Sequence, residues 1–301
     1  MAQDRPYRSG FACLVGRPNT GKSTLTNALV GAKVAITSGR PQTTRHAVRG
    51  VLHRPDGQLV LVDTPGFHRP RTLLGERLND VVLTTLGEVD VVVFCVPADQ
   101  GVGPGDRFIA GKLAGLGRTP LVAAVTKTDA AARQQVAERL VEVADLGDFA
   151  EIVPVSARAG DQVGLLADLL LGLLPEGPVL YPDGELTDEP EHVMVAELVR
   201  EAALEGVRDE LPHSLAVLVE EMAPRPDHPR GLVDVRVEIY VERPTQKAIV
   251  IGRGGARLKE VGSRARREIE ALLGSPVYLD LHVRVAPDWQ RDPKQLRKLG
   301  F

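Results

Sequence analysis

The sequence predicts an α/β fold with a mainly parallel sheet, followed by a smaller α+β domain, and three observations support this prediction. Nearly continuous apolar runs alternate with longer amphipathic stretches over residues 11–174, as expected when helices cover both faces of a parallel sheet. Residues 175–191, PEGPVLYPDGELTDEPE, collect Pro, Gly and acidic residues without any period, which is typical of a linker. Beyond them, alternating runs flank helix-like stretches. A chain of 301 residues is long enough for two domains with separate cores.

The first domain is predicted to contain five strands with helices between them. In chain order the strands are FACLVG, LVLVD, VDVVVFCV, LVAAVTK and EIVPVSA. The segments STLTNALVG, QQVAERLVEVADL and QVGLLADLLLGLL have the length and spacing of amphipathic helices. We place this domain at residues 1–178 and the linker at residues 179–192.

The second domain, residues 193–301, is predicted to begin with the helix-like segment VMVAELVREAALEGVRDEL. Two alternating runs follow, LAVLVEEM and VDVRVEIYV, and then the apolar run of AIVIGRGG. A helix-like segment, ARLKEVGSRARREIEALLG, and a last strand, VYLDLHVRV, complete it. These elements predict a small α+β domain.

The composition is ordinary for a soluble globular protein, with 43% hydrophobic and 26% charged residues. The N-terminus lacks the apolar stretch of a secretory signal, and no apolar run reaches the roughly 20 residues that a membrane span needs. We therefore expect a soluble, cytoplasmic protein. Cys13 and Cys95 lie in predicted strands without metal-ligand spacing, so buried thiols are expected. The seven histidines form no cluster that predicts a metal site built from protein ligands alone.

Charge is unevenly distributed along the chain. The net charge is −3, yet residues 231–301 carry 14 Lys and Arg against 9 Asp and Glu. A basic end on an acidic protein favours a nucleic-acid partner, although a solvated surface is the alternative.

The stretch GRPNTGKST, residues 16–24, matches the phosphate-binding pattern G-x-x-x-x-G-K-[ST] in full. It follows a predicted strand and precedes a predicted helix, which is the context that the pattern requires. Its glycines let backbone N–H groups curl around phosphates at a helix N-terminus, while Lys22 reaches the terminal phosphates. The hydroxyl of Ser23 is placed to ligate Mg²⁺. This loop predicts a nucleotide site.

Three later segments favour GTP over ATP. In DTPG, Asp63 ends a strand where it can hold Mg²⁺ through water, and Gly66 can offer its N–H to a γ-phosphate. In TKTD, the carboxylate of Asp129 can accept both N–H groups of the guanine edge, which adenine lacks. In SAR, the N–H of Ala157 can meet the guanine O6. The predicted GTP-binding residues are Asn19, Thr20, Gly21, Lys22, Ser23, Thr24, Thr126, Lys127, Asp129, Ser156, Ala157 and Arg158.

Between the phosphate loop and DTPG lies a polar segment, SGRPQTTRHAV, that is long enough to close over a γ-phosphate. We choose Thr44 as its magnesium-ligating hydroxyl, with Thr43 as the alternative. Triphosphate would order this segment and diphosphate would release it. The predicted metal ligands are thus Ser23, Thr44 and Asp63, and the predicted catalytic residues are Lys22, Thr44, Asp63 and Gly66. The arginines of this segment, Arg40, Arg45 and Arg49, are expected to be solvated rather than catalytic.

The run AIVIGRGGARLKEV contains a G-x-x-G loop, as in KH domains. A loop without bulky side chains lets a nucleic-acid backbone approach closely. We expect single-stranded bases to lie on an apolar floor rather than on aromatic platforms, in keeping with the low aromatic content. The predicted RNA-binding residues are Lys247, Ile251, Gly252, Arg253, Gly254, Gly255, Arg257, Leu258 and Lys259. Arg264, Arg266 and Arg267 are expected to be the solvated face of the following helix.

The order GRPNTGKS, PQTTRH, DTPGFH, TKTD and SAR, followed by the G-x-x-G domain, resembles the Era GTPase family over nearly the whole chain. The resemblance implies a P-loop GTPase domain and a type II KH domain. It also implies Mg²⁺-dependent hydrolysis of GTP to GDP, and binding near the 3′ end of 16S ribosomal RNA during assembly of the small (30S) subunit. Peripheral contact with the inner face of the cell membrane is an alternative that the resemblance leaves open, and a monomer is the default expectation.

Two departures bear on this resemblance. Thr126 stands where many relatives carry Asn, so a hydroxyl remains but the carboxamide that braces the phosphate loop is lost. Unlike in Ras, Phe67 rather than a water-orienting Gln follows Gly66, so intrinsic hydrolysis should be slow. A K⁺ ion held by Asn19 is one way to complete the site; the alternative is that Asn19 only stabilises the loop turn. Two rival functions remain, an RNA-binding scaffold with a structural nucleotide and an ATP-using phosphotransferase.

Overall fold

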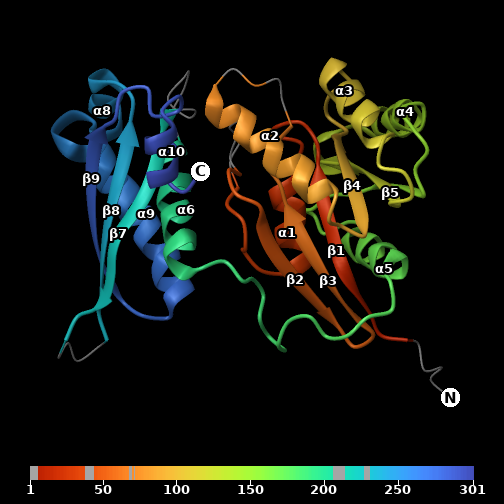
Figure 1. The fold of residues 1–301 in the computed structure, drawn as a ribbon, viewed down its shortest axis with the longest axis horizontal. Coiled ribbons are helices and arrows are strands. Elements are labelled where there is room, and N and C mark those ends of the chain that lie inside the picture. Colours follow the sequence, from red (N-terminus) through yellow and green to blue (C-terminus); the bar gives the residue numbers. More distant parts are fainter. Residues whose placement is uncertain (1–5, 38–43, 68–69, 71, 206–213, 227–230) are drawn as a thin grey trace. The chain divides into compact units, whose positions relative to one another are not determined.

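A computed structural model of the chain contains two compact units (Figure 1). The first unit comprises most of the chain up to Asp188, and the second comprises Glu189–Phe301 together with residues 72–74. The division at Asp188 falls inside the range predicted as a linker. The structure describes residues 6–37, 44–67, 70, 72–205, 214–226 and 231–301.

The first unit contains a six-stranded sheet with the strand order β2-β3-β1-β4-β5-β6. Only β2 and β3 pair antiparallel, and every other pair is parallel, so the predicted mainly parallel sheet is confirmed. All residues of β3 and β4 are buried, which explains their unbroken apolar runs. The strand bounds are β1 Arg8–Val15, β2 Val48–Arg54, β3 Gly57–Asp63, β4 Val91–Pro97, β5 Leu121–Thr126 and β6 Glu151–Pro154.

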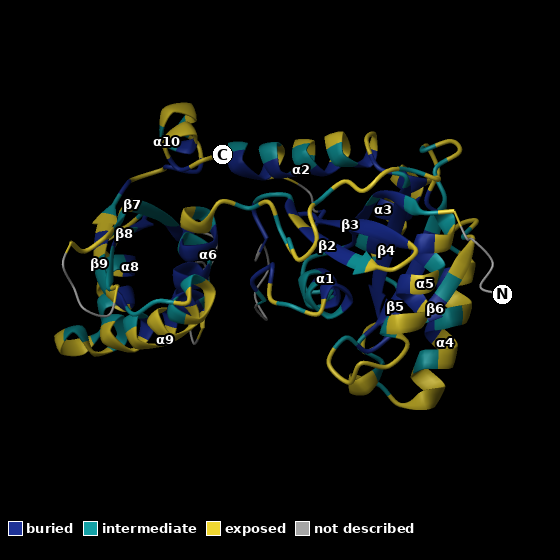
Figure 2. Cartoon of the chain, turned by 90° about the horizontal axis from the view of Figure 1, so that it is seen from below, coloured by how far each residue is buried: buried dark blue, intermediate teal, exposed yellow. Residues whose placement is uncertain are grey.

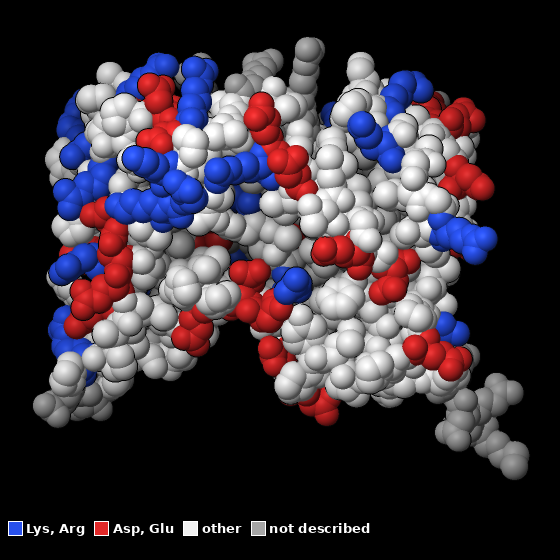
Figure 3. Space-filling model, viewed as in Figure 1, with Lys and Arg blue, Asp and Glu red and all other residues white. Residues whose placement is uncertain are grey.

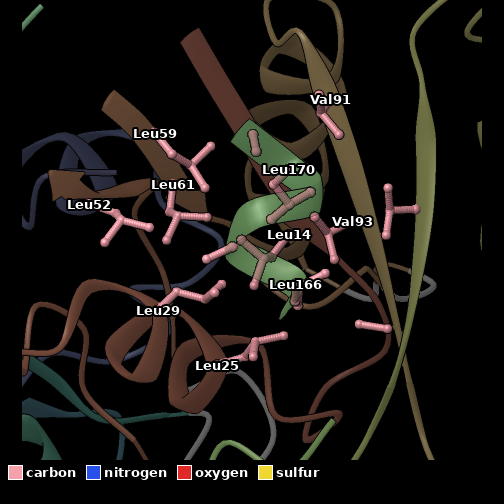
Figure 4. Packing of buried hydrophobic residues seen from close by; sticks show 14 of the residues in the cluster. Leu14, Leu25, Leu29, Leu52, Leu59, Leu61, Val91, Val93, Leu166 and Leu170 are labelled. Carbon is pink, nitrogen blue, oxygen red and sulfur yellow. The ribbon is translucent and has the colours of Figure 1, made fainter. Parts of the chain in front are cut away.

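Helices cover both faces of this sheet (Figure 1). On one face, Leu14 of β1 packs in a cluster with Leu25 and Leu29 of α1 and Leu166 and Leu170 of α5 (Figure 4). Residues of α2, α3 and α4 belong to the cluster on the other face. The helix bounds are α1 Lys22–Val30, α2 Leu73–Leu86, α3 Pro104–Leu113, α4 Arg133–Ala144 and α5 Val163–Leu173. Sequence periodicity predicted α1, α4 and α5, but neither α2 nor α3, nor strand β2.

Residues 178–188, most of the predicted linker, hydrogen-bond to the first unit. The N–H of Val51 in β2 donates to the carbonyl of Leu186 at 2.9 Å. The side-chain oxygen of Gln58 accepts from the N–H groups of Leu180 (2.7 Å) and Tyr181 (3.0 Å). This segment is therefore a bound strap rather than a free spacer.

The second unit has a three-stranded sheet with the order β7-β8-β9, in which β7 and β8 are antiparallel and β8 and β9 parallel. Helices α6 and α9 lie on one side of it (Figure 2). The order helix, two strands, two helices and strand is that of the predicted type II KH arrangement. The apolar run AIVI belongs to helix α8, which leads into the G-x-x-G loop. The bounds are α6 Glu191–Leu204, β7 Ala216–Pro224, β8 Val233–Val241, α8 Pro244–Ile251, α9 Ala256–Leu273, β9 Val277–Val285 and α10 Pro293–Lys298.

Alternation along β8 separates the two faces of this sheet. Val235, Val237 and Ile239 are buried, whereas the residues between them are charged, so one face packs on the helices and the other is polar. Trp289 is fully buried, and its indole N–H donates to the carbonyl of Ser214 at 2.9 Å. Among the helices described here, none is long and apolar enough to cross a bilayer.

Candidate nucleotide-binding site and nucleic-acid interface

The phosphate loop turns tightly between β1 and α1. Asn19 and Gly21 both have left-handed backbone conformations, with φ of 63° and 90°, which Asn and Gly tolerate best. The ammonium of Lys22 donates to the carbonyls of Gly16 (3.3 Å) and Arg17 (3.0 Å). Thr24 lies in the first turn of α1. The loop thus presents its amides and a lysine at a helix N-terminus, as the pattern predicts.

The three predicted metal ligands converge at one point. The hydroxyls of Ser23 and Thr44 donate to Oδ2 of Asp63 at 2.6 and 3.0 Å, and the two hydroxyl oxygens lie 2.9 Å apart. Asp63 is fully buried, and among the described residues its Oδ1 has no hydrogen-bond partner. A buried carboxylate oxygen without a partner, beside two hydroxyls, is a donor set that suits a hard cation such as Mg²⁺.

Burial disfavours the charged forms of Lys22 and Asp63 at this point. It lowers the pKa of Lys22 and raises the pKa of Asp63, because both charged groups are removed from water. Their mutual attraction counters part of each shift. A polyphosphate beside Lys22 and a cation beside Asp63 would stabilise both charged forms, so the site is preorganised for a nucleotide with its metal.

The residues predicted to read guanine follow the ends of β5 and β6. The hydroxyl of Ser156 donates to Oδ1 of Asp129 at 2.6 Å and accepts from the N–H of Ala159 at 3.0 Å. These bonds hold the carboxylate of Asp129 against the loop that also carries Ala157 and Arg158. The structure therefore brings the TKTD and SAR segments together.

Thr126 braces the phosphate loop although it lacks a carboxamide. Its hydroxyl donates to the carbonyl of Thr20 at 2.5 Å, and both residues are buried. Thr20 in turn donates its own hydroxyl to the carbonyl of Arg17 at 3.0 Å. Lys127 follows with a left-handed backbone and lies 3.7 Å from the carboxylate of Asp99. The expected loss of bracing is thus offset by a shorter side chain that reaches the same loop.

The DTPG turn packs directly on the phosphate loop. A Cβ on Gly66 would lie 2.8 Å from backbone atoms of Pro18, so only glycine fits there. Phe67 donates its N–H to the carbonyl of Gly16 at 3.1 Å. Its ring is 7% exposed and lies 5.8 Å from the ring of Phe108, centroid to centroid. Phe67 is therefore a residue of the hydrophobic core.

The structure describes only part of the polar segment SGRPQTTRHAV between the phosphate loop and DTPG. Arg40 and Thr43 lie outside the described residues. Arg45 is 2% exposed, so the expectation that it is solvated is wrong. Arg49 is half exposed and pairs with Asp188 at 3.0 Å.

The G-x-x-G loop has the backbone that its glycines allow. Gly252, Gly254 and Gly255 have φ values of 73°, 59° and 81°, in the region that favours glycine. A Cβ on Gly252 would lie 2.7 Å from the Cβ of Arg257. Arg253 is exposed at the loop tip. The loop is thus open to a close backbone approach.

A groove of about 370 Å³ begins at this loop and runs between α9 and β9. Of the predicted RNA-binding residues, only Gly255, Leu258 and Lys259 line it. The remaining six lie outside its lining: Lys247 and Ile251 in α8, and Gly252, Arg253, Gly254 and Arg257. Arg266 lines it too, so its assignment to the solvated face is incomplete. Sequence reasoning missed the far wall, because nothing in the alternation of β9 tells which strand borders a groove. The residues missed are Tyr278, Leu279 and Leu281 of β9, together with Gly262 and Ser263 of α9.

Arg257 is engaged within the fold. Its guanidinium donates to the carbonyls of Ala203 (3.2 Å) and Glu205 (2.7 Å) at the end of α6. A cation at a helix C-terminus stabilises that helix. This geometry indicates that Arg257 caps the end of α6 and holds it in place.

A second hollow, of about 740 Å³, lies on the polar side of the same sheet and differs in charge. Acidic residues stand among its cations, since Glu220 and Glu238 line it and Arg284 donates to Glu238 at 2.9 Å. Figure 3 shows Lys and Arg interspersed with Asp and Glu over this unit. The groove beside the G-x-x-G loop has no acidic residue in its lining and is the better surface for a polyanion.

Two family models match this chain, one in each unit. A family model described as "50S ribosome-binding GTPase" matches residues 11–127, and one described as "KH domain" matches residues 210–290. The chain is 68% identical to GTPase Era of Streptomyces coelicolor, a match that covers 98% of this chain and 95% of that protein. It is 63% identical to GTPase Era of Mycolicibacterium smegmatis, over 98% of this chain and 99% of that protein.

Two solved structures are similar over the whole length. One is Era in complex with MgGDPNP and nucleotides 1506–1542 of 16S ribosomal RNA, with a TM-score of 0.93 and 38% identity, covering 98% of this chain and 99% of that one. The other is an Aquifex aeolicus Era variant bound to GDP and AlF4⁻, with a TM-score of 0.93 and 38% identity, covering 97% and 99%.

Proposed function

The chain belongs to the Era family of GTPases, and we propose that it is a GTP-driven switch that binds the 3′ end of 16S ribosomal RNA and assists assembly of the small ribosomal subunit. The observation that carries the nucleotide half is the meeting of Ser23, Thr44 and Asp63 beside Lys22. Thr44 belongs to the segment between the phosphate loop and β2, so a bound triphosphate and its metal would tie that segment to the loop.

Hydrolysis is proposed to rest on electrostatics and positioning. Lys22 and the loop amides hold the β- and γ-phosphates, and the N–H of Gly66 is aimed at the γ-phosphate. Mg²⁺, when bound, would neutralise charge on the phosphate oxygens; Ser23 and Thr44 are the proposed direct ligands and Asp63 the group that holds it through water. Because the side chain of Phe67 has no hydrogen-bonding group, it cannot orient the attacking water. We therefore expect slow turnover unless K⁺ at Asn19 or a partner completes the site.

The RNA half is supported by the relative solved with nucleotides 1506–1542 of 16S ribosomal RNA and by the groove beside the G-x-x-G loop. Arg253 and Lys259 are the proposed phosphate contacts and Leu258 the groove floor. We further propose a cytoplasmic monomer, with peripheral membrane contact as the alternative.

The test measures the affinity of the full chain for a short RNA matching the 3′ end of 16S ribosomal RNA, with a non-hydrolysable GTP analogue and with GDP. A tenfold tightening with the analogue, about 1.4 kcal/mol of coupling, supports one switch. Affinity that ignores the nucleotide would instead support the scaffold alternative. Competition between GTP and ATP for the site tests the phosphotransferase alternative.

A matched pair of variants controls for charge. Arg253→Glu reverses a charge at the tip of the G-x-x-G loop, and Arg267→Glu makes the same change on the exposed side of α9, outside the groove lining. Loss of RNA binding in Arg253→Glu alone supports the G-x-x-G loop as the contact. Equal losses in both variants would point to nonspecific charge attraction.

A further inference from the structure

Arg17 is the second residue of the phosphate loop, and its side chain extends from that loop to helix α3. Its Nε donates to Oδ1 of Asp106 at 2.7 Å. Asp106 lies in the first turn of α3 and is fully buried, while the side chain of Arg17 is 26% exposed. A Cβ on Gly105 would lie 2.7 Å from Cδ of Arg17, so the stem of the arginine packs directly on this turn. The phosphate loop is thus tied to α3 by an ion pair with a buried carboxylate.

The carboxylate of Asp106 is itself fixed. Its Oδ2 accepts from the N–H of Gly103, the residue before α3, at 2.8 Å. The N–H of Asp106 in turn donates to the carbonyl of Gly103 at 3.1 Å. A carboxylate in the first turn of a helix is also stabilised by the helix dipole. Both carboxylate oxygens are therefore engaged, and the guanidinium of Arg17 meets a fixed acceptor.

The main chain of Arg17 holds the lysine of the phosphate loop. Its carbonyl accepts from the ammonium of Lys22 at 3.0 Å and from the hydroxyl of Thr20 at 3.0 Å. One residue is therefore held by Asp106 through its side chain and holds Lys22 through its carbonyl. A shift of Arg17 would move the acceptor that sets the ammonium of Lys22.

The ion pair is poorly suited to a purely stabilising role. Burying a carboxylate removes it from water, and this cost offsets most of the attraction between the two charges. Moreover, Nη2 of Arg17 is buried and has no hydrogen-bond partner among the residues that the structure describes. Neutral side chains of similar shape would stabilise the fold as well. The effect of the pair is therefore expected in the position of the phosphate loop.

From these contacts we propose that Arg17 and Asp106 are a positioning pair for GTP hydrolysis, which sets the ammonium of Lys22 against the γ-phosphate. The inference rests on the proposed role of Lys22 and adds to it two residues whose side chains lie outside the proposed nucleotide contacts. Charge in the transition state is spread over the oxygens of the transferred phosphoryl group, so hydrolysis depends on where the cation stands. Affinity for GDP is shared with the loop amides and the guanine-reading residues, so it depends less on that position.

The test compares single-turnover release of phosphate from GTP with the affinity for GDP. Arg17→Met and Asp106→Asn should each slow hydrolysis roughly 10- to 100-fold, since a misplacement of about 1 Å can cost about 100-fold, while GDP affinity stays within about threefold. The double variant should be no slower than the slower single variant, because the two residues act as one unit. Arg17→Lys, which keeps a cation opposite Asp106, should hydrolyse GTP faster than Arg17→Met. Arg107→Met makes the same change at the next, exposed residue of α3 and should leave both measurements unchanged.

Urea unfolding separates position from stability. Each single variant leaves one charge without its partner and should lower the unfolding midpoint, whereas the double variant removes both charges at similar shape and should unfold like the wild type. A double variant of wild-type stability that hydrolyses GTP slowly supports the pair. Wild-type hydrolysis by the double variant, or a loss of GDP affinity as large as the loss of turnover, overturns it. If Lys22→Ala hydrolysed GTP at the wild-type rate, the proposed role of Lys22 would fail and the pair would fail with it.

Discussion

Replacing Thr126 by Val is the sharpest test of the nucleotide site, because it removes one hydrogen bond and keeps the shape of the side chain. The lost donor is the hydroxyl that reaches the carbonyl of Thr20 at 2.5 Å. Both residues are buried, 4% and 1% exposed, so water cannot replace it. An unsatisfied buried carbonyl costs about 1–3 kcal/mol. Because this carbonyl belongs to the phosphate loop, we expect affinity for GDP and GTP to fall.

If 1–2 kcal/mol of that cost appears in binding, the dissociation constant rises roughly 5- to 30-fold. Isothermal titration with GDP measures it, and urea unfolding without nucleotide measures the share lost as stability. Thr128→Val is the matched control, since it removes a hydroxyl from the adjacent 3₁₀ turn instead of from the brace. Binding by Thr126→Val within twofold of the wild type would refute the brace. Thr126→Asn, the residue of many relatives, should bind at least as well as the wild type.

Three further outcomes are expected. Phe67→Ala should lower the free energy of unfolding by about 3–5 kcal/mol in urea, because it empties a buried ring position; an unchanged midpoint would contradict its place in the core. Asp63→Asn should raise the Mg²⁺ concentration for half-maximal GTP turnover about 10- to 100-fold, as for groups that hold a metal through its bound ligands; unaltered Mg²⁺ dependence would remove Asp63 from the site. Burial raises the pKa of Cys95 to about 12, so its thiol should stay protonated and resist iodoacetamide at pH 8 until urea unfolds the chain; fast labelling of the native protein would be inconsistent with its burial.

The sequence predicted the parts whose signal is local. The phosphate loop, Asp63 and Asp129 stand in short patterns after apolar strands, and strands such as β4 are buried on both faces, so composition alone reveals them. Strand β2 was missed because Arg49 and His53 interrupt its apolar residues, which packing against β3 then orders. Likewise, Thr126 could be placed in its motif, but the reach of its hydroxyl to Thr20 depends on tertiary distance.

The nucleic-acid surface was predicted less completely for a similar reason. The G-x-x-G loop has a sequence pattern, whereas Leu279 and Leu281 meet α9 only because β9 pairs with β8 at the edge of the sheet. Arg257 shows the converse, since a basic residue beside the loop turns back to the carbonyls of α6. As a basic residue, Arg257 was predicted to contact phosphate, whereas in the structure its guanidinium caps helix α6.

The strap formed by residues 178–188 has a consequence for any shortened form of the protein. Strand β2 ends the six-stranded sheet, and the outward N–H of Val51 is covered by Leu186. An uncovered edge strand is a template for pairing with another chain. A GTPase domain cut after Leu174 would lose this cover and become prone to aggregate edge to edge, whereas one that ends at Asp188 would keep it. The connection between the two units thus also protects the first from self-association.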